Sequence, residues 1–107
     1  MRRGEFYRVH KPTGDTKTQR VYVIVSRQLL IDSKFSRVIC APVYSNGQGL
    51  STQVAVGVEE GLKYPSWIMC DALISISKTA LRDFIGSLSR SRMRELDRAL
   101  KMALELV

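Results

Sequence analysis

The sequence is poor in the residue types from which most enzymes build proton-transfer and metal sites. It has a single histidine, His10, and two cysteines, Cys40 and Cys70. One histidine cannot form a histidine acid–base pair, and cysteines this scattered lack the spacing of a zinc site. Glycine-rich phosphate-binding motifs and clusters of carboxylates are missing as well. We therefore expect no cofactor and no metal ion.

Long apolar runs are also missing. No stretch approaches the roughly 20 apolar residues that cross a bilayer, and residues 1–5 are not followed by the apolar segment of a secretory signal. The sequence therefore predicts a cytoplasmic protein without membrane contact. Cys40 and Cys70 lie in apolar stretches and are expected to be reduced core residues; a disulfide between them is the alternative.

Acidic residues are scarce too, with 10 Asp and Glu against 17 Lys and Arg, for a net charge of +7. Residues 1–50 hold nine basic and three acidic residues, whereas residues 51–107 hold eight and seven. The positive excess is thus concentrated in the first half. A positive surface attracts polyanions, so this pattern favours a nucleic-acid partner; a surface that only confers solubility is the alternative.

What the sequence does contain is a series of short apolar and β-branched runs separated by turn residues. Five to seven short strands are predicted from these runs, in residues 4–10, 20–26, 37–44, 52–56, 66–70, 72–76 and 84–88. Helical turns are expected at 27–33 and 78–82, and a basic loop at 11–19. Residues 1–107 are therefore expected to form one mainly β domain with some α structure. Its predicted form is a small, strongly bent sheet with a C-terminal helix.

Certain residues carry more specific structural expectations. Pro42 cannot donate a ladder hydrogen bond and indicates an edge strand or a bulge. Gly86 indicates a bulge or a close backbone approach, and Glu59-Glu60 is expected to be a solvated turn. Ser89 fits the N-cap of the final helix, whose first turn is basic although the helix dipole favours acidic groups there. The apolar face of this helix comprises Met93, Leu96, Leu100, Ala103 and Val107.

RNA cleavage is a chemistry that suits so few titratable groups. RNA carries its own nucleophile, the 2′-hydroxyl next to the scissile phosphate. A protein then needs to orient the attack, stabilise the phosphate charge and assist proton movement. One arginine and one hydroxyl supply much of this, since the arginine fork holds two phosphate oxygens at once.

Several segments, in order, make the chain resemble the MazF/PemK family of toxin ribonucleases. They are Arg3-Gly4-Glu5-Phe6-Tyr7, Gln19-Arg20 before an apolar run, Pro42-Val43-Tyr44-Ser45-Asn46, Met69-Cys70-Asp71 and Ile85-Gly86-Ser87-Leu88-Ser89. The resemblance implies an SH3-like bent barrel with a C-terminal helix. It implies a homodimer that cuts single-stranded RNA selectively, as the toxin of a toxin–antitoxin pair. It also implies a small acidic antitoxin that covers the RNA groove.

By position, the resemblance also assigns candidate site residues. Arg20 takes the place of the catalytic arginine, Tyr44 that of a catalytic threonine with Ser45 directly after it, and Asp71 that of an aspartate in the RNA site. Lys17, Gln19 and Asn46 are the further RNA-binding candidates. Four positions differ from the family: Val21 replaces proline, Tyr44 replaces threonine, and Ala72 and Ile74 replace glutamine and arginine. Arg20 is expected to stabilise charge, and either Tyr44 or Ser45 supplies the hydroxyl.

Two other functions remain open at this stage. The altered site positions allow an RNA-binding or interaction protein without catalytic activity on the same fold. A gyrase poison like the related CcdB proteins is the third possibility. A resemblance to CcdB would imply a final helix that ends in Trp-Gly-Ile, whereas this chain ends in Leu104-Glu105-Leu106-Val107.

Overall fold

The computed structural model describes residues 1–10 and 19–106 of the chain. Its strands are β1 (Glu5–Val9), β2 (Arg20–Ile24), β3 (Arg37–Tyr44), β4 (Gln53–Val56), β5 (Ser66–Met69), β6 (Ile74–Ser77) and β7 (Asp83–Ser87). Its helices are α1 (Gln28–Asp32) and α2 (Arg90–Leu104). Three short 3-10 turns complete the described elements: η2 (Val58–Glu60), η3 (Cys70–Ala72) and η4 (Lys78–Ala80). The predicted loop at 11–19 lies outside the described residues, except for its last one.

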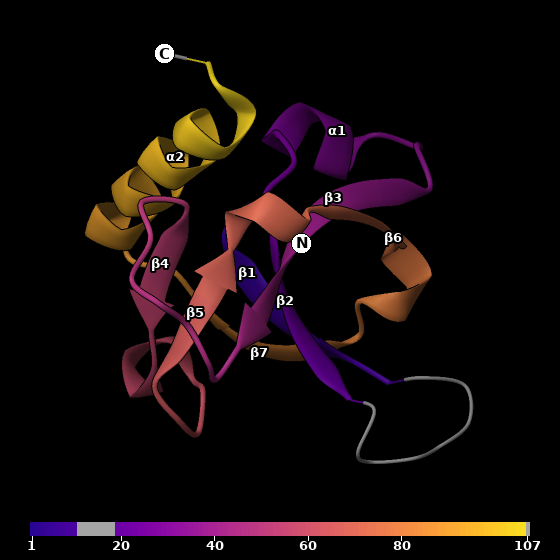
Figure 1. Cartoon of the computed structure of the whole chain (residues 1–107). Helices are drawn as coiled ribbons and strands as arrows, with labels where there is room; N and C mark the ends of the chain where they lie inside the picture. The colour runs from indigo at the N-terminus through magenta and orange to yellow at the C-terminus, as the bar shows by residue number, and fades with distance from the viewer. Residues whose placement is uncertain (11–18, 107) are drawn as a thin grey trace.

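The strands form one antiparallel sheet in the order β4-β5-β3-β2-β1-β7, with β6 paired to β3. Figure 1 shows this sheet strongly curled, with α2 across one side and α1 near the start of β3. The expected fold class is confirmed: a mainly β, strongly bent sheet with a C-terminal helix. None of the described helices is long and apolar enough to cross a membrane.

The alternation of side chains along each strand gives the sheet two apolar faces. Phe6 and Val23 are paired across β1 and β2, and both are fully buried in the larger core with Leu96 of α2. The neighbouring Tyr7 and Ile24 point to the other face and join a smaller core beside α1. Successive residues of a strand face opposite sides, so the same five-residue segments supply both cores. Because both faces are buried, these segments do not alternate between apolar and polar residues as a strand with one solvent-exposed face does.

Pro42 does not mark an edge, because β3 is a central strand with β2 on one side and β6 and β5 on the other. The pairing with β6 ends at Cys40, and the pairing with β5 begins at Val43. Pro42 therefore lies where β3 changes partner, a place where the sheet does not need a ladder hydrogen bond. The prediction of an edge strand or a bulge at Pro42 was wrong. Its physical reason, that proline cannot donate a ladder hydrogen bond, still explains why Pro42 lies where β3 changes partner.

Gly86 is both at a bulge and at a close approach, as predicted. Phe6 pairs with Gly86 and Tyr7 pairs with Phe84, which leaves one extra residue in β7. A Cβ atom on Gly86 would lie 2.2 Å from the backbone oxygen of Glu60. Glu60 is itself buried, and its carboxylate accepts a 2.6 Å hydrogen bond from the backbone N–H of Gly57. The expectation of a solvated turn holds for the exposed Glu59 and was wrong for Glu60, because the turn docks on β7.

Helix α2 begins after Ser89, whose hydroxyl accepts a hydrogen bond from the backbone N–H of Arg92 at 3.3 Å. The N-cap prediction is confirmed. Leu96 is buried in the larger core and Met93 packs against it, as the helical periodicity predicted. Val107 lies outside the described residues. Cys40 and Cys70 are buried and free.

Candidate functional site

Arg20 begins β2 and lines a surface pocket of about 230 Å³. The pocket lies where β2 begins and β3 ends, against the segment that follows η2. It is lined by Arg8, Gln19, Arg20, Val21, Val43, Ser45, Leu62, Lys63, Tyr64 and Ser66. Three of these side chains are cations, three carry hydroxyl groups, and none is a carboxylate. Such a lining suits an anionic ligand that also accepts hydrogen bonds.

Tyr44, the last residue of β3, lies beneath Arg20. The pair Val21 and Val43 aligns the two strands, so Arg20 and Tyr44 face each other at the next position. The guanidinium carbon of Arg20 lies 4.2 Å from the centroid of the Tyr44 ring, where the ring face attracts a cation. The ring covers one face of the guanidinium. The N–H donors lie in the guanidinium plane and remain available to a ligand.

The two hydroxyl candidates have different positions. Ser45 is exposed and lines the Arg20 pocket, whereas the Tyr44 ring is half-buried under the guanidinium. Gln19 also lines the pocket. The structure thus brings Gln19, Arg20 and Ser45 together. Two residues along β2, burial raises the pKa of Tyr22, an effect that the charge of Arg20 partly opposes.

Asn46 lies outside the Arg20 pocket, in the loop that joins β3 to β4. It lines a separate hollow of about 400 Å³. The side-chain oxygen of Gln53 holds this loop by accepting hydrogen bonds from the backbone N–H groups of Gln48, at 2.9 Å, and Gly49, at 3.1 Å. The loop is therefore fixed to β4 rather than to the pocket.

Gly47 of the same loop lies directly on the ring of Trp67. A Cβ atom at this position would lie 2.1 Å from a ring carbon of Trp67. Trp67 is paired with Tyr44 across β5 and β3. A residue without a side chain is thus required where the loop crosses the tryptophan next to the site.

Asp71 is held by a neighbour other than Arg20. The hydroxyl of Thr52 donates a 2.6 Å hydrogen bond to its carboxylate. Asp71 lies in η3, after the end of β5, and it is not among the residues that line the Arg20 pocket. The pocket of this chain therefore contains Arg20 without Asp71. Lys17, another predicted site residue, lies outside the described residues.

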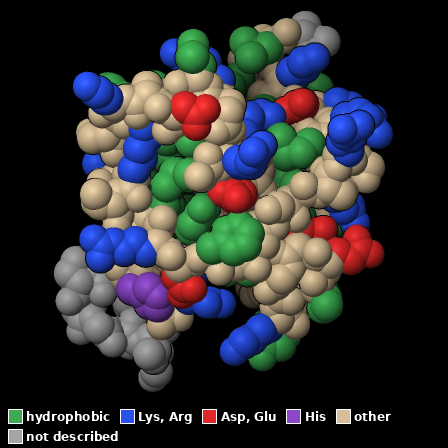
Figure 2. Space-filling model, turned by 180° about the vertical axis from the view of Figure 1, so that it is seen from behind, with side chains coloured by type: hydrophobic (Ala, Val, Ile, Leu, Met, Phe, Trp, Pro, Cys, Tyr) green, Lys and Arg blue, Asp and Glu red, His purple; other side chains and the backbone are tan. Residues whose placement is uncertain are grey.

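Two cations of the pocket, Arg8 and Lys63, were missed by sequence reasoning. Arg8 pairs with Val21 and with Asp83, which places it on the pocket side of β1. Asp83 is 3.4 Å from Arg8 and 3.2 Å from the ring nitrogen of His10. In Figure 2 the single histidine lies against a carboxylate on this face of the molecule. The sequence signal that could have identified Arg8 is a charged residue within an otherwise apolar strand. Lys63 lies in a loop and had no such signal.

The carboxylate of Asp83 is kept charged by these neighbours. Its pKa is lowered, first by the hydrogen bond with His10 and also by the hydrogen bond and charge of Arg8, against an opposing effect of burial. The Arg8 guanidinium is therefore anchored at its far side while it lines the pocket. Within the described ranges, no group of three or more His, Cys, Asp or Glu residues could hold a metal ion.

A strongly bent antiparallel sheet with a C-terminal helix is the fold of MazF toxins, and the chain matches it over nearly its whole length. The chain belongs to the family described as "PemK-like, MazF-like toxin of type II toxin-antitoxin system", whose sequence model matches residues 2–104. No curated protein sequence matches the chain.

Solved structures give the same result. The toxin MazF-mt6 of Mycobacterium tuberculosis superposes with a TM-score of 0.81 at 26% identity, covering 94% of this chain and 96% of that one. A mycobacterial endoribonuclease in complex with its cognate antitoxin has a TM-score of 0.84 at 24% identity, covering 98% and 95%. MazF in a MazE–MazF structure from Deinococcus radiodurans has a TM-score of 0.74 at 16% identity, covering 94% and 91%.

Proposed function

We propose that this toxin is an endoribonuclease that cuts single-stranded RNA at selected sequences and without a metal ion. The observation that carries the proposal is the convergence of Arg20, Arg8 and Lys63 around one pocket that Ser45 also lines. A scissile phosphate gains negative charge in the transition state, and preorganised cations stabilise that charge. Membership of the toxin family and the likeness to solved endoribonucleases support the same activity.

The proposed reaction uses the substrate's own hydroxyl. The 2′-oxygen attacks phosphorus, the bond from phosphorus to the 5′-oxygen breaks, and a 2′,3′-cyclic phosphate and a free 5′-hydroxyl form. The proton lost by the 2′-hydroxyl goes to a base, and the departing 5′-oxygen gains a proton. Arg20 and Arg8 hold the phosphate oxygens, because arginine is a poor proton donor at neutral pH. Ser45 is the hydroxyl in the pocket that assists proton movement.

RNA recognition is proposed to involve the other predicted residues as well. Gln19 lines the pocket beside Arg20 and is placed to contact the nucleotide there. Lys17 is a further RNA contact, and Asn46 and Asp71 contact RNA further from the cut. Asn46 and Asp71 lie away from the pocket in this chain, so their contacts involve other nucleotides of the same strand.

The partners and location follow from the family. We propose a homodimer in the cytoplasm that is inhibited by an acidic antitoxin. The solved complexes of mycobacterial and Deinococcus relatives with antitoxins support this assignment. The positive charge of the chain, +7, is complementary to an acidic inhibitor.

Cleavage of a long single-stranded RNA in EDTA tests the activity. The wild type is expected to yield fragments with 2′,3′-cyclic phosphate ends, and Arg20→Ala is expected to yield none above background. Sequencing of the fragments' 5′ ends then gives the cleaved motif. Intact RNA after incubation with wild type, over a broad set of sequences, would refute the proposal.

A second candidate function is RNA binding without cleavage. The engagement of the Tyr44 ring by Arg20 favours it, because the threonine hydroxyl implied at this position is replaced. It predicts salt-sensitive RNA binding with intact product, and weaker binding after charge reversal of Lys17 and Arg20. Equal binding by that variant would exclude this second function.

A further inference from the structure

One side of helix α2 carries four cations in a row, which we call the cationic stripe: Arg90, Arg94, Arg98 and Lys101. They are spaced by four, four and three residues, so a helix of 3.6 residues per turn places them on one face. All four side chains are exposed. With a rise of 1.5 Å per residue, the stripe is about 16 Å long.

The carboxylates beside the stripe are already paired with other arginines. Asp97 is 2.9 Å from Arg3, and Glu95 is 3.1 Å from Arg92. Within the described part of the chain, the four stripe residues have no ion-pair partner. The stripe residues thus make no ion pair with Glu95 and Asp97, although these two carboxylates line the same groove.

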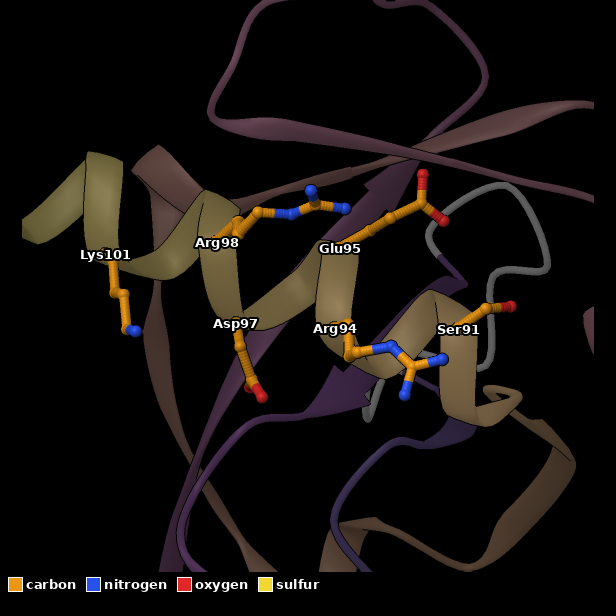
Figure 3. A pocket seen from close by; sticks show the side chains of 6 residues that line it. All are labelled: Ser91, Arg94, Glu95, Asp97, Arg98 and Lys101. Atoms are coloured by element: carbon orange, nitrogen blue, oxygen red, sulfur yellow. The ribbon is translucent and has the colours of Figure 1, made fainter.

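The stripe borders an open groove of about 540 Å³ on the outer side of α2. Figure 3 shows Arg94 and Lys101 pointing to the same side of the helix, with Arg98 directed the other way. The groove is lined by Ser91, Arg94, Glu95, Asp97, Arg98 and Lys101. Arg94 and Lys101 thus extend to one side of α2, whereas Arg98 also lines a second hollow beside β4 and β5.

This arrangement is unfavourable for an isolated helix in two ways. Like charges four residues apart repel each other, and the first turn of α2 contains no acidic residue although the positive end of the helix dipole lies there. An anionic partner along the stripe would offset both unfavourable effects.

We propose that the cationic stripe of α2 binds the phosphate backbone of RNA, outside the segment that is held in the Arg20 pocket. The proposal rests on the proposed function, since it assigns RNA as the anion. In Figure 1 α2 lies at the opposite end of the molecule from the start of β2, where Arg20 is. The stripe is therefore a second contact for long RNA, independent of sequence, because backbone contacts carry no base information.

The test is the salt dependence of binding to a fluorescent, single-stranded RNA of about 40 nucleotides with 2′-O-methyl groups throughout. These groups cap the nucleophile, so the RNA stays intact whether or not the protein is a ribonuclease. The variant replaces Arg90, Arg94, Arg98 and Lys101 by glutamine, which keeps a good helix propensity. At about 0.7 per phosphate contact, the slope of log K against log salt is expected to fall by about 3.

Two control variants separate the stripe from net charge. In the first, glutamine replaces four exposed cations elsewhere: Arg2, Arg27, Lys34 and Arg82. Its slope is expected to stay close to that of the wild type. In the second, lysine replaces Arg90, Arg94 and Arg98, and the slope is retained because a backbone contact needs charge rather than a fork. Circular dichroism and thermal melting check folding, and neutralising the stripe is expected to leave Tm unchanged or higher.

Three results would overturn the proposal. Equal loss of slope in the charge-matched control would assign the effect to net charge. An unchanged slope in the stripe variant would show that the stripe does not bind RNA. If that variant kept its RNA slope but lost binding to polyglutamate, the stripe would be a surface for an acidic protein. Failure of the wild type to cut RNA leaves this test intact, because binding is read on RNA that cannot be cut.

Discussion

The guanidinium of Arg20 is stacked on the ring of Tyr44, 4.2 Å from its centroid, at the rim of the pocket. The stack holds an arginine that would otherwise lose considerable rotamer freedom on binding phosphate. We therefore propose that Tyr44 positions Arg20 through its ring, a role that does not require its hydroxyl. The hydroxyl that lines the pocket belongs to Ser45.

Substitution of Tyr44 is expected to separate the ring from the hydroxyl. Tyr44→Phe keeps the stack and should retain RNA cleavage within about twofold. Tyr44→Leu removes a stabilisation of about 1–2 kcal/mol, so kcat/KM should fall about 5- to 30-fold. Single-turnover cleavage of one defined RNA measures both variants. A large loss in Tyr44→Phe would show instead that the phenol hydroxyl takes part in the reaction.

Arg8 is expected to contribute to the same reaction although it lies on another strand. Arg8→Gln removes one cation from the pocket, and loss of a charge-assisted contact of about 1.5–3 kcal/mol should lower kcat/KM by about 10- to 100-fold. Arg82→Gln, an exposed cation that does not line the pocket, is the matched control and should cleave normally. Asp83→Asn frees Arg8 and should give an intermediate loss. Equal activity of Arg8→Gln and Arg82→Gln would remove Arg8 from the site.

A methyl group on Gly86 is expected to destabilise the fold. Gly86→Ala forces its Cβ against the backbone oxygen of Glu60, 2.2 Å away, and backbone cannot rotate aside as a side chain can. We expect a loss of about 2–3 kcal/mol in the free energy of unfolding. Ser87→Ala, exposed on the same strand, should change it by less than about 0.5 kcal/mol. Urea titration of the two variants gives the difference, and equal midpoints would contradict the close approach.

Stability is expected to decline at alkaline pH because of the buried thiols. Burial raises the pKa of Cys40 from 9.0 to about 12, and that of Cys70 to about 11. Above pH 9 the unfolded chain loses these protons while the folded chain keeps them, so the unfolded state gains stability as pH rises. For Cys40 alone, this difference amounts to about 2–3 kcal/mol between pH 9 and pH 11.

Cys40→Val is the matched control for that decline. The variant has no thiol to ionise at this position, so its stability should fall less steeply than that of the wild type over the same range. Tyr7, whose pKa burial raises to about 12, affects both proteins alike. Denaturant titrations at pH 8, 9, 10 and 11 give the two curves. Parallel curves would show that the Cys40 thiol is not isolated from solvent in the folded state.

Sequence reasoning was most successful where the signal is local. The run from Arg20 to Ile24 and the helix after Ser89 were predicted because β-branched content, capping and periodicity are properties of neighbouring residues. The two cores were also within reach, since alternation along a strand sorts side chains by face. The position of Pro42 in the sheet could not be predicted, because it depends on where β3 changes its pairing from β6 to β5.

The site was predicted only in part, for the same physical reason. Arg20 and Ser45 could be identified by their resemblance to a family pattern, and the structure places both at one pocket. Arg8 joins them through strand register, and Lys63 through a loop that folds over β7. The register depends on the extra residue of β7 next to Gly86, and no local pattern states which strands will be neighbours.

The pairing of β1 with β7 ties residues near the start of the chain to residues near its end, as in Arg8 opposite Asp83. Contacts so distant in sequence form late and slow folding down. A chain emerging from the ribosome holds β1 with an open edge until β7 is made, and Leu96 completes the larger core later still. The carboxylate that anchors Arg8 arrives with β7. A nascent or truncated chain without β7 therefore holds Arg8 without its carboxylate partner, although all the residues that line the pocket have already been made.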